Sequence, residues 1–139
     1  MRSQKSMIAR RGPLAGLVLA LLALALAGCG VGAATNEEKI SKTVTTYLKA
    51  LADGDAAAAC AQLTPSAKGA GCEAAMRARL SRLDSEALTK AADGSMDIDV
   101  NGDTATAGLS EPEGARFVLA RIGDEWRIDS GYTLGPISG

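Results

Sequence analysis

The chain has 139 residues, a length that suits one domain, with 15 basic and 16 acidic residues and a net charge of −1 at pH 7. It has no histidine, no glycine-rich phosphate loop and no basic stripe beyond residue 28. These features exclude Ser-His-Asp and Cys-His catalysis and make nucleic acid an unexpected partner.

The first 28 residues are typical of a secretory signal peptide. Residues 1–11 carry four basic side chains and no acid, and Leu14 to Ala27 is a run of fourteen Leu, Ala, Val and Gly residues. As a helix this run spans about 21 Å, short of the roughly 30 Å bilayer core. An uncleaved signal anchor is the alternative. Gly12-Pro13 after Arg10-Arg11 does not fit a twin-arginine signal, so we expect general secretion.

A four-residue motif ends the apolar run. Leu26-Ala27-Gly28-Cys29 resembles the lipobox of bacterial lipoproteins. The resemblance implies a diacylglyceryl thioether on Cys29 and cleavage between Gly28 and Cys29 by the lipoprotein signal peptidase. A buried cysteine at a helix end is the alternative. We therefore expect a lipid-anchored protein of the cell membrane or cell envelope that faces outside the cytoplasm.

Cleavage would leave an acidic domain, because residues 1–28 carry four of the 15 basic residues and none of the 16 acids. The remaining 11 basic and 16 acidic residues give a net charge of −5. An anionic membrane surface repels such a domain, so the lipid itself must hold the protein on the membrane.

Lipidation of Cys29 leaves one pair of cysteines, Cys60 and Cys72, in a compartment where disulfides persist. We expect them to form a disulfide. A metal pair and two free thiols are the alternatives, but without histidine or a third thiol a zinc site would lack ligands. The sequence thus indicates no metal and no cofactor.

Residues 29–35 form the lipidated cysteine and a short tether, and helical signals follow. Thr35 and Glu38 predict a capping box, and Gly54 predicts the end of the first helix. One face of this helix is apolar. It comprises Ile40, Val44, Tyr47, Leu48 and Leu51.

Two more helices are expected before the strands. Asp55 predicts the cap of a short helix that runs to about Leu63 and stops near Pro65, and residues 69–71 predict a loop. A third helix begins at Cys72 and reaches the Leu83 region, with a break at Asp84-Ser85 and a last turn through Leu88. Its apolar face comprises Cys72, Met76, Leu80 and Leu83. Its other face carries Arg77, Arg79 and Arg82, which indicate either an anion site or a solvated surface.

The hydrophobic period then changes from 3.6 to 2, which predicts antiparallel strands. The expected strands are residues 96–100, 104–109, 116–122 and 125–129. The expected turns are Asn101-Gly102, residues 111–114 and Gly123-Asp124. Residues 131–139 form a tail in which Tyr132 and Leu134 could add an edge segment. Helices followed by hairpins predict an α+β domain, with the N-terminal helices packed on a curved antiparallel sheet of about four strands.

The order of elements over residues 36–130 resembles a small member of the NTF2-like, or cystatin-like, superfamily. Four motifs support this resemblance. They are Val44-x-x-Tyr47-Leu48-x-Ala50-Leu51-x-x-Gly54-Asp55, a second helix with Cys60, the hairpin Val100-x-Gly102-Asp103-x-Ala105 and the last strand Glu125-Trp126-Arg127-Ile128. The resemblance implies a conical cavity between the long helix and the sheet, used as a ligand pocket or an active site.

Five residues are candidates for lining such a cavity: Tyr47, Met76, Phe117 and Trp126, with Asp129 at its mouth. Ordinary core packing is the alternative for the first four. We expect a non-catalytic module that binds a protein partner or a small apolar ligand. The alternatives are an isomerase or dehydratase that uses Asp129 with Tyr47, and a structural envelope protein without ligand. The sequence does not indicate the oligomeric state.

Overall fold

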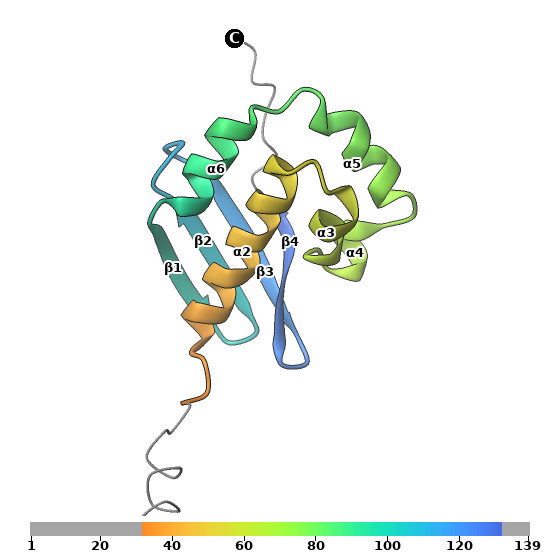
Figure 1. Ribbon diagram of the computed structural model, residues 1–139. Coiled ribbons are helices and arrows are strands. Elements are labelled where there is room, and N and C mark those ends of the chain that lie inside the picture. Colours follow the sequence, from red (N-terminus) through yellow and green to blue (C-terminus); the bar gives the residue numbers. More distant parts are fainter. Residues whose placement is uncertain (1–31, 132–139) are drawn as a thin grey trace, which may run out of the picture. The chain divides into compact units, whose positions relative to one another are not determined.

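The computed structural model describes residues 32–131, and the compact folded unit begins at Ala34. Cys29, the expected signal peptide and residues 132–139 lie outside the described residues. In the described range, five helices precede four strands, and the helices pack against an open antiparallel sheet (Figure 1). The predicted α+β class is therefore confirmed. None of the helices in residues 32–131 has the length and apolarity needed to cross a bilayer.

The long helix α2 (Asn36–Ala52) begins at the predicted capping box. The Thr35 hydroxyl accepts a hydrogen bond from the Glu38 N–H at 3.2 Å, and the Glu38 carboxylate accepts one from the Thr35 N–H at 2.9 Å. Two of the N–H groups that a helix start leaves unpaired are thus satisfied. The buried face of α2 comprises Ile40, Val44, Leu48, Ala50 and Leu51.

Gly54 ends α2, as predicted. Its φ of +73° is a conformation that glycine adopts without steric cost, and its N–H donates to the Leu51 carbonyl at 3.2 Å. The Asp55 N–H donates to the Ala50 carbonyl at 2.8 Å. These two bonds form a Schellman motif, which reverses the chain into the next helix.

Helix α3 (Ala56–Ala61) is shorter than predicted. Asp55 caps it as expected, since its carboxylate accepts from the Ala58 N–H at 2.9 Å. The expected extension to Leu63 is wrong, because Leu63 forms a parallel bridge with Ile128 of the sheet. A pairing across more than sixty residues thus outweighs the local helical tendency.

Pro65 was predicted to lie where a helix stops. In the structure it is also the first residue of a further short helix, α4 (Pro65–Lys68). The Thr64 hydroxyl caps it by accepting from the Ala67 N–H at 3.1 Å. Proline suits the first position of a helix because the N–H that it lacks would have no partner there. The predicted loop at residues 69–71 follows.

The predicted third helix is two helices, α5 (Cys72–Leu80) and α6 (Ser85–Asp93). The expectation of a single last turn through Leu88 is wrong. The Asp84 carboxylate accepts from the N–H groups of the two residues at positions 86 and 87, so it caps a full helix. Helix α6 packs on α2 and buries Leu88, Ala91 and Ala92.

The four strands form a meander in the order β1-β2-β3-β4, each antiparallel to the next. They are β1 (Met96–Asn101), β2 (Thr104–Leu109), β3 (Arg116–Ile122) and β4 (Glu125–Gly131). The first hairpin turn lies at Gly102-Asp103, one residue later than predicted, because Asn101 still pairs with Thr104. Strand β4 also runs two residues beyond its predicted end.

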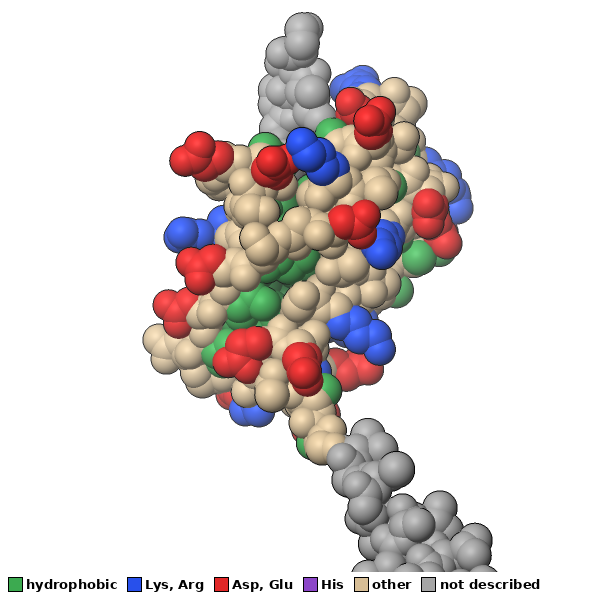
Figure 2. Space-filling model, turned by 60° about the vertical axis from the view of Figure 1, so that its left-hand side comes forward, with side chains coloured by type: hydrophobic (Ala, Val, Ile, Leu, Met, Phe, Trp, Pro, Cys, Tyr) green, Lys and Arg blue, Asp and Glu red, His purple; other side chains and the backbone are tan. Residues whose placement is uncertain are grey.

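The core lies between α2, α6 and one face of the sheet. Ala105, Ala107 and Leu109 of β2 alternate with exposed or half-buried neighbours, and Phe117 and Leu119 of β3 do the same. Acidic and basic side chains alternate over the face drawn in Figure 2, around a narrow strip of hydrophobic atoms. A continuous basic surface is absent from this face, in keeping with the charge balance of the sequence.

Candidate functional site

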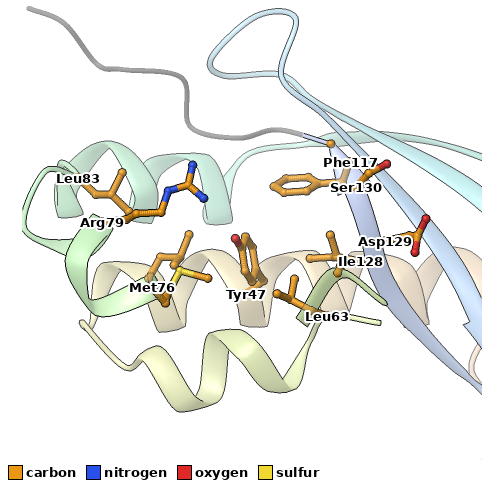
Figure 3. Close-up of a pocket in the computed structure, with 12 residues that line it drawn as sticks. Tyr47, Leu63, Met76, Arg79, Leu83, Phe117, Ile128, Asp129 and Ser130 are labelled. Carbon is orange, nitrogen blue, oxygen red and sulfur yellow. The ribbon is translucent and has the colours of Figure 1, made fainter. Parts of the chain in front are cut away.

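A cavity of about 110 Å³ lies beside Tyr47 of α2, between α5 and the C-terminal end of β4 (Figure 3). Most of its wall is apolar. The aliphatic and aromatic lining residues besides Tyr47 include Leu51, Leu63, Met76, Leu83, Phe117 and Ile128. The cavity brings together four of the five predicted pocket residues, since Tyr47, Met76, Phe117 and Asp129 all line it.

Two aromatic rings form the inner wall of this cavity. Tyr47 and Phe117 pack edge to face, with 5.8 Å between their ring centroids and 82° between their planes. Phe117 is 1% exposed and comes from β3, whereas Tyr47 is half-buried on α2. The pair thus joins the long helix to the centre of the sheet with a favourable edge-to-face geometry.

The Tyr47 hydroxyl points into the cavity. Burial raises the pKa of this hydroxyl, and the positive charge of Arg79 opposes the rise with a smaller effect. The hydroxyl is therefore neutral near pH 7 and can donate a proton in a hydrogen bond. Within residues 32–131 it has no hydrogen-bond partner.

Arg79 is a polar lining residue that the predicted pocket did not include. It was expected on the far face of its helix, with Arg77 and Arg82, yet it lines the cavity beside Met76. Met76 and Arg79 are three residues apart, so their side chains are neighbours on the helix surface. This spacing could have indicated that Arg79 borders the same cavity as Met76. Figure 3 shows its guanidinium directed toward the space that Tyr47 and Phe117 border.

The other cavity residue with a charge, Asp129, is engaged elsewhere. Its carboxylate accepts a hydrogen bond from the Thr64 hydroxyl at 2.9 Å, and the side chain is exposed. In Figure 3 it lies beyond Ile128 and is directed away from Tyr47. Asp129 thus connects β4 to the cap of α4, and the figure shows no approach of its carboxylate to the phenol.

Trp126, the fifth predicted residue, does not line this cavity. It is 2% exposed and lies near the start of α2, where its indole N–H donates to the Asn36 side-chain carbonyl at 3.2 Å. The Trp126 carbonyl accepts from the Thr43 hydroxyl at 3.0 Å. Trp126 precedes Ile128, which does line the cavity, by two strand positions, or about 7 Å along β4.

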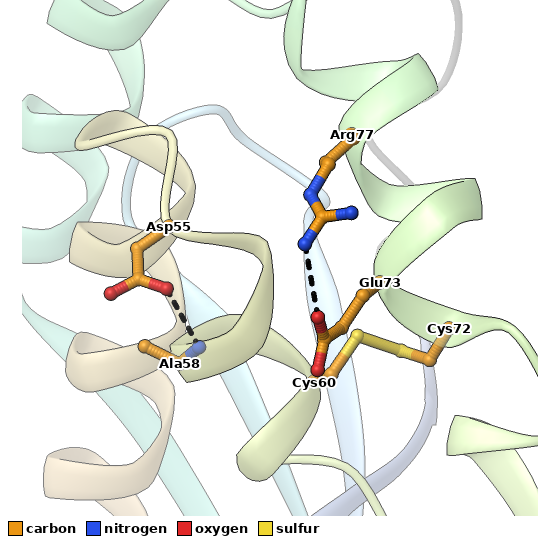
Figure 4. The surroundings of a disulfide bond; sticks show 6 residues. All are labelled: Asp55, Ala58, Cys60, Cys72, Glu73 and Arg77. Atoms are coloured by element: carbon orange, nitrogen blue, oxygen red, sulfur yellow. Dashed lines mark hydrogen bonds and ion pairs between the residues drawn. A yellow bond between two sulfur atoms is a disulfide. The ribbon is translucent and has the colours of Figure 1, made fainter.

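The predicted disulfide joins Cys60 of α3 to Cys72 of α5, with 6.1 Å between the two Cα atoms (Figure 4). Helix α5 buries only Met76, so its apolar contacts alone hold it weakly. The disulfide and the exposed Glu73–Arg77 ion pair lie at its first turns. Since Arg79 and Met76 belong to α5, the disulfide fixes the helix that forms one side of the cavity.

The cavity offers an apolar surface, the hydroxyls of Tyr47 and Ser130, the Arg79 cation and the Asp129 carboxylate, which accepts from Thr64. Residues 32–131 contain no cluster of three or more His, Cys, Asp or Glu side chains that could hold a metal ion. The groups present in the cavity can therefore bind and orient a small molecule by apolar contact and by hydrogen bonds to an acceptor.

Comparison with known proteins does not show a family for this chain. No family model matches the chain, and no curated protein matches it. Among solved structures, it is similar to a protein of unknown function from Mycobacterium tuberculosis, with 12% sequence identity and a TM-score of 0.47. The similarity covers 94% of this chain and 83% of that chain.

Proposed function

We propose that this protein is a membrane-anchored lipoprotein outside the cytoplasm, whose folded domain binds a small apolar ligand without catalysing a reaction. The observation that carries the binding role is the apolar cavity of about 110 Å³ bordered by Tyr47 and Phe117. Small-molecule sites are typically concave and mostly apolar, with a few polar groups that orient the ligand, and this cavity has that character.

The size of the cavity limits its ligand. Pockets for drug-sized molecules measure about 300–1,000 Å³, whereas an apolar cavity of roughly 150 Å³ accommodates benzene. A volume of about 110 Å³ suits a single small ring or a short branched chain, part of which extends through the opening. A side chain of a protein partner would also fit, and it is the alternative occupant.

Binding can be tested with benzyl alcohol as the probe and two-dimensional amide NMR as the measurement. The suitable sample is the chain from residue 30 onward, because the compact unit begins at Ala34. We expect shifts at residues around Tyr47 and Phe117. The Ala67→Leu variant fills the exposed side of the cavity and should weaken binding, whereas Ala57→Leu, an exposed alanine of α3 outside the cavity, should not. Uniform shifts, or none at saturating probe, would refute a binding cavity.

The membrane anchor rests on the signal-like residues 1–28 and on Leu26-Ala27-Gly28-Cys29. The test is metabolic labelling with a clickable fatty acid, followed by fractionation and mass spectrometry of the N-terminus. We expect label and membrane association in the wild type, and loss of both in Cys29→Ala. Cys60→Ala with Cys72→Ala is the matched control, since that pair should not accept lipid. An unlabelled wild-type protein that retains residues 1–28 would contradict the proposal.

We also propose, from the sequence resemblance, that the domain is NTF2-like. The isomerase or dehydratase alternative would need the Asp129 carboxylate beside a substrate near Tyr47. The exposure of Asp129 and its hydrogen bond to Thr64 do not favour that role, so we do not advance it. A structural protein without ligand is the remaining alternative, and the NMR titration tests it.

A further inference from the structure

Two of the hydrogen-bond donors that border the cavity, one from α2 and one from α5, have no partner in the described part of the chain. One is the Tyr47 hydroxyl, and the other is the Arg79 guanidinium, for which residues 32–131 provide no ion pair or hydrogen bond. Figure 3 shows both directed toward the same space, which lies between Arg79 and the ring of Phe117. An apolar ligand alone would leave both donors dependent on water.

From this juxtaposition we propose that the ligand is a small carboxylate with an apolar body, an aromatic or short branched-chain acid. The inference rests on the proposed binding function and names its ligand class. The apolar body occupies the cavity between Tyr47 and Met76. The carboxylate lies at the opening, where Arg79 donates a bidentate pair of hydrogen bonds and Tyr47 donates one.

Charge favours a carboxylate over a phosphate. Arg79 supplies one positive charge at the opening, and the other charged residue among the described residues that line the cavity is the acidic Asp129. A monoanion balances the arginine, whereas a dianion would leave a negative charge near a carboxylate. The whole unit from Ala34 onward carries 11 basic and 16 acidic residues, so its field also disfavours a highly charged anion.

The other arginines of this region do not compete for the ligand. Arg77 pairs with Glu73 at 3.1 Å, one turn away on the same helix. Arg82 is exposed in the segment after α5 and does not line the cavity. Arg82 is therefore the matched control for Arg79, because both are exposed arginines near the same end of the helix.

The test compares benzoate with benzyl alcohol, which has the same ring and no charge, by NMR titration of the chain from residue 30 onward. Benzoate should bind the cavity about tenfold more tightly than benzyl alcohol. Arg79→Gln should weaken benzoate binding about tenfold and leave benzyl alcohol unaffected. Tyr47→Phe, which keeps the ring, should weaken benzoate binding severalfold. Arg82→Gln should stay within about twofold of the wild type.

The outcomes separate this inference from the binding function. Equal affinities for the two probes, or no effect of Arg79→Gln, would overturn the carboxylate while leaving the apolar cavity intact. Failure of both probes would overturn the carboxylate and the binding function together. Inorganic phosphate is a further probe: if it displaces benzoate at similar concentration, the opening recognises charge alone and the inference is wrong.

Discussion

The aromatic rings of Tyr47 in α2 and Phe117 in β3 pack edge to face, with 5.8 Å between their centroids. The contact joins two elements that lie seventy residues apart in the sequence and forms the inner wall of the cavity. It therefore serves both the stability of the fold and the shape of the proposed binding site.

This contact should be measurable as a coupling energy. We expect Tyr47→Leu and Phe117→Leu each to lower the free energy of unfolding, and the double variant to lose less than the sum of the two. The difference should be about 0.5–1.5 kcal/mol, the range found for edge-to-face pairs. Urea denaturation of the four proteins gives the double-mutant cycle. If the double variant lost the sum of the two single losses in unfolding free energy, to within about 0.3 kcal/mol, the rings would not stabilise each other.

The disulfide should stabilise the protein and, above all, α5. Cys60→Ala with Cys72→Ala removes a cross-link of sequence separation 12, which we expect to cost about 3 kcal/mol. Hydrogen exchange should accelerate more in α5 than in α2, because α5 buries only Met76 whereas α2 buries a whole face. Uniform acceleration along the chain would show that the disulfide does not act mainly on α5. The same variant should also weaken probe binding, since α5 carries Arg79.

The sequence predicted those elements whose signals are local. The Thr35–Glu38 capping box, the Gly54 terminus and the alternation of the four strands each depend on residues within a few positions of one another. The boundaries that failed depend on distant partners. Helix α3 ends early because Leu63 pairs with Ile128. The length of α6 was underestimated because Asp84-Ser85 was interpreted as a break in the preceding helix, whereas Asp84 caps a new one.

The cavity could be predicted only in part, because its shape also depends on contacts between residues that are distant in the sequence. Alternation along residues 125–129 indicates that Trp126 and Ile128 share one face of β4, and both are buried. Alternation does not show which of the two lies opposite Tyr47. That position depends on how α2 crosses the sheet. Arg79 was interpreted, with Arg77 and Arg82, as either an anion site or a solvated surface, and not as part of the cavity. An arginine at the edge of an apolar face can border a cavity and remain exposed.

The last residue of β4 allows a close approach of two strands beside the cavity. Gly131 has a φ of +125°, and a Cβ atom there would lie 2.5 Å from the Arg116 carbonyl oxygen and 2.7 Å from the Phe117 Cα. We expect Gly131→Ala to lower the free energy of unfolding by about 2 kcal/mol, because it adds steric overlap with backbone and an unfavourable φ. Gly32→Ala, with no atom within 4 Å of its Cβ, should change it by less than about 0.5 kcal/mol. Equal effects of the two substitutions in thermal or urea denaturation would contradict this account.

The buried phenol should make stability depend on alkaline pH. The pKa of Tyr47 is raised above its ordinary value of 10.0, chiefly by burial. The unfolded chain therefore loses this proton before the folded chain does, so the contribution is fully present below pH 10 and is lost as the pH rises toward the folded-state pKa. The free energy of unfolding should fall more between pH 9 and pH 11 in the wild type than in Tyr47→Phe, as measured by urea denaturation.

Arg79 provides a second check on the same titration. Its positive charge lowers the pKa of Tyr47 and so offsets part of the effect of burial. Arg79→Gln should therefore raise that pKa further and steepen the alkaline loss of stability, whereas Arg82→Gln should leave it as in the wild type. Absorbance of the phenolate, taken as the difference between each protein and its Tyr47→Phe counterpart, reports the pKa directly. If Arg79→Gln left that pKa unchanged, the guanidinium would not act on the hydroxyl, and the paired donors proposed for a carboxylate would not share one site.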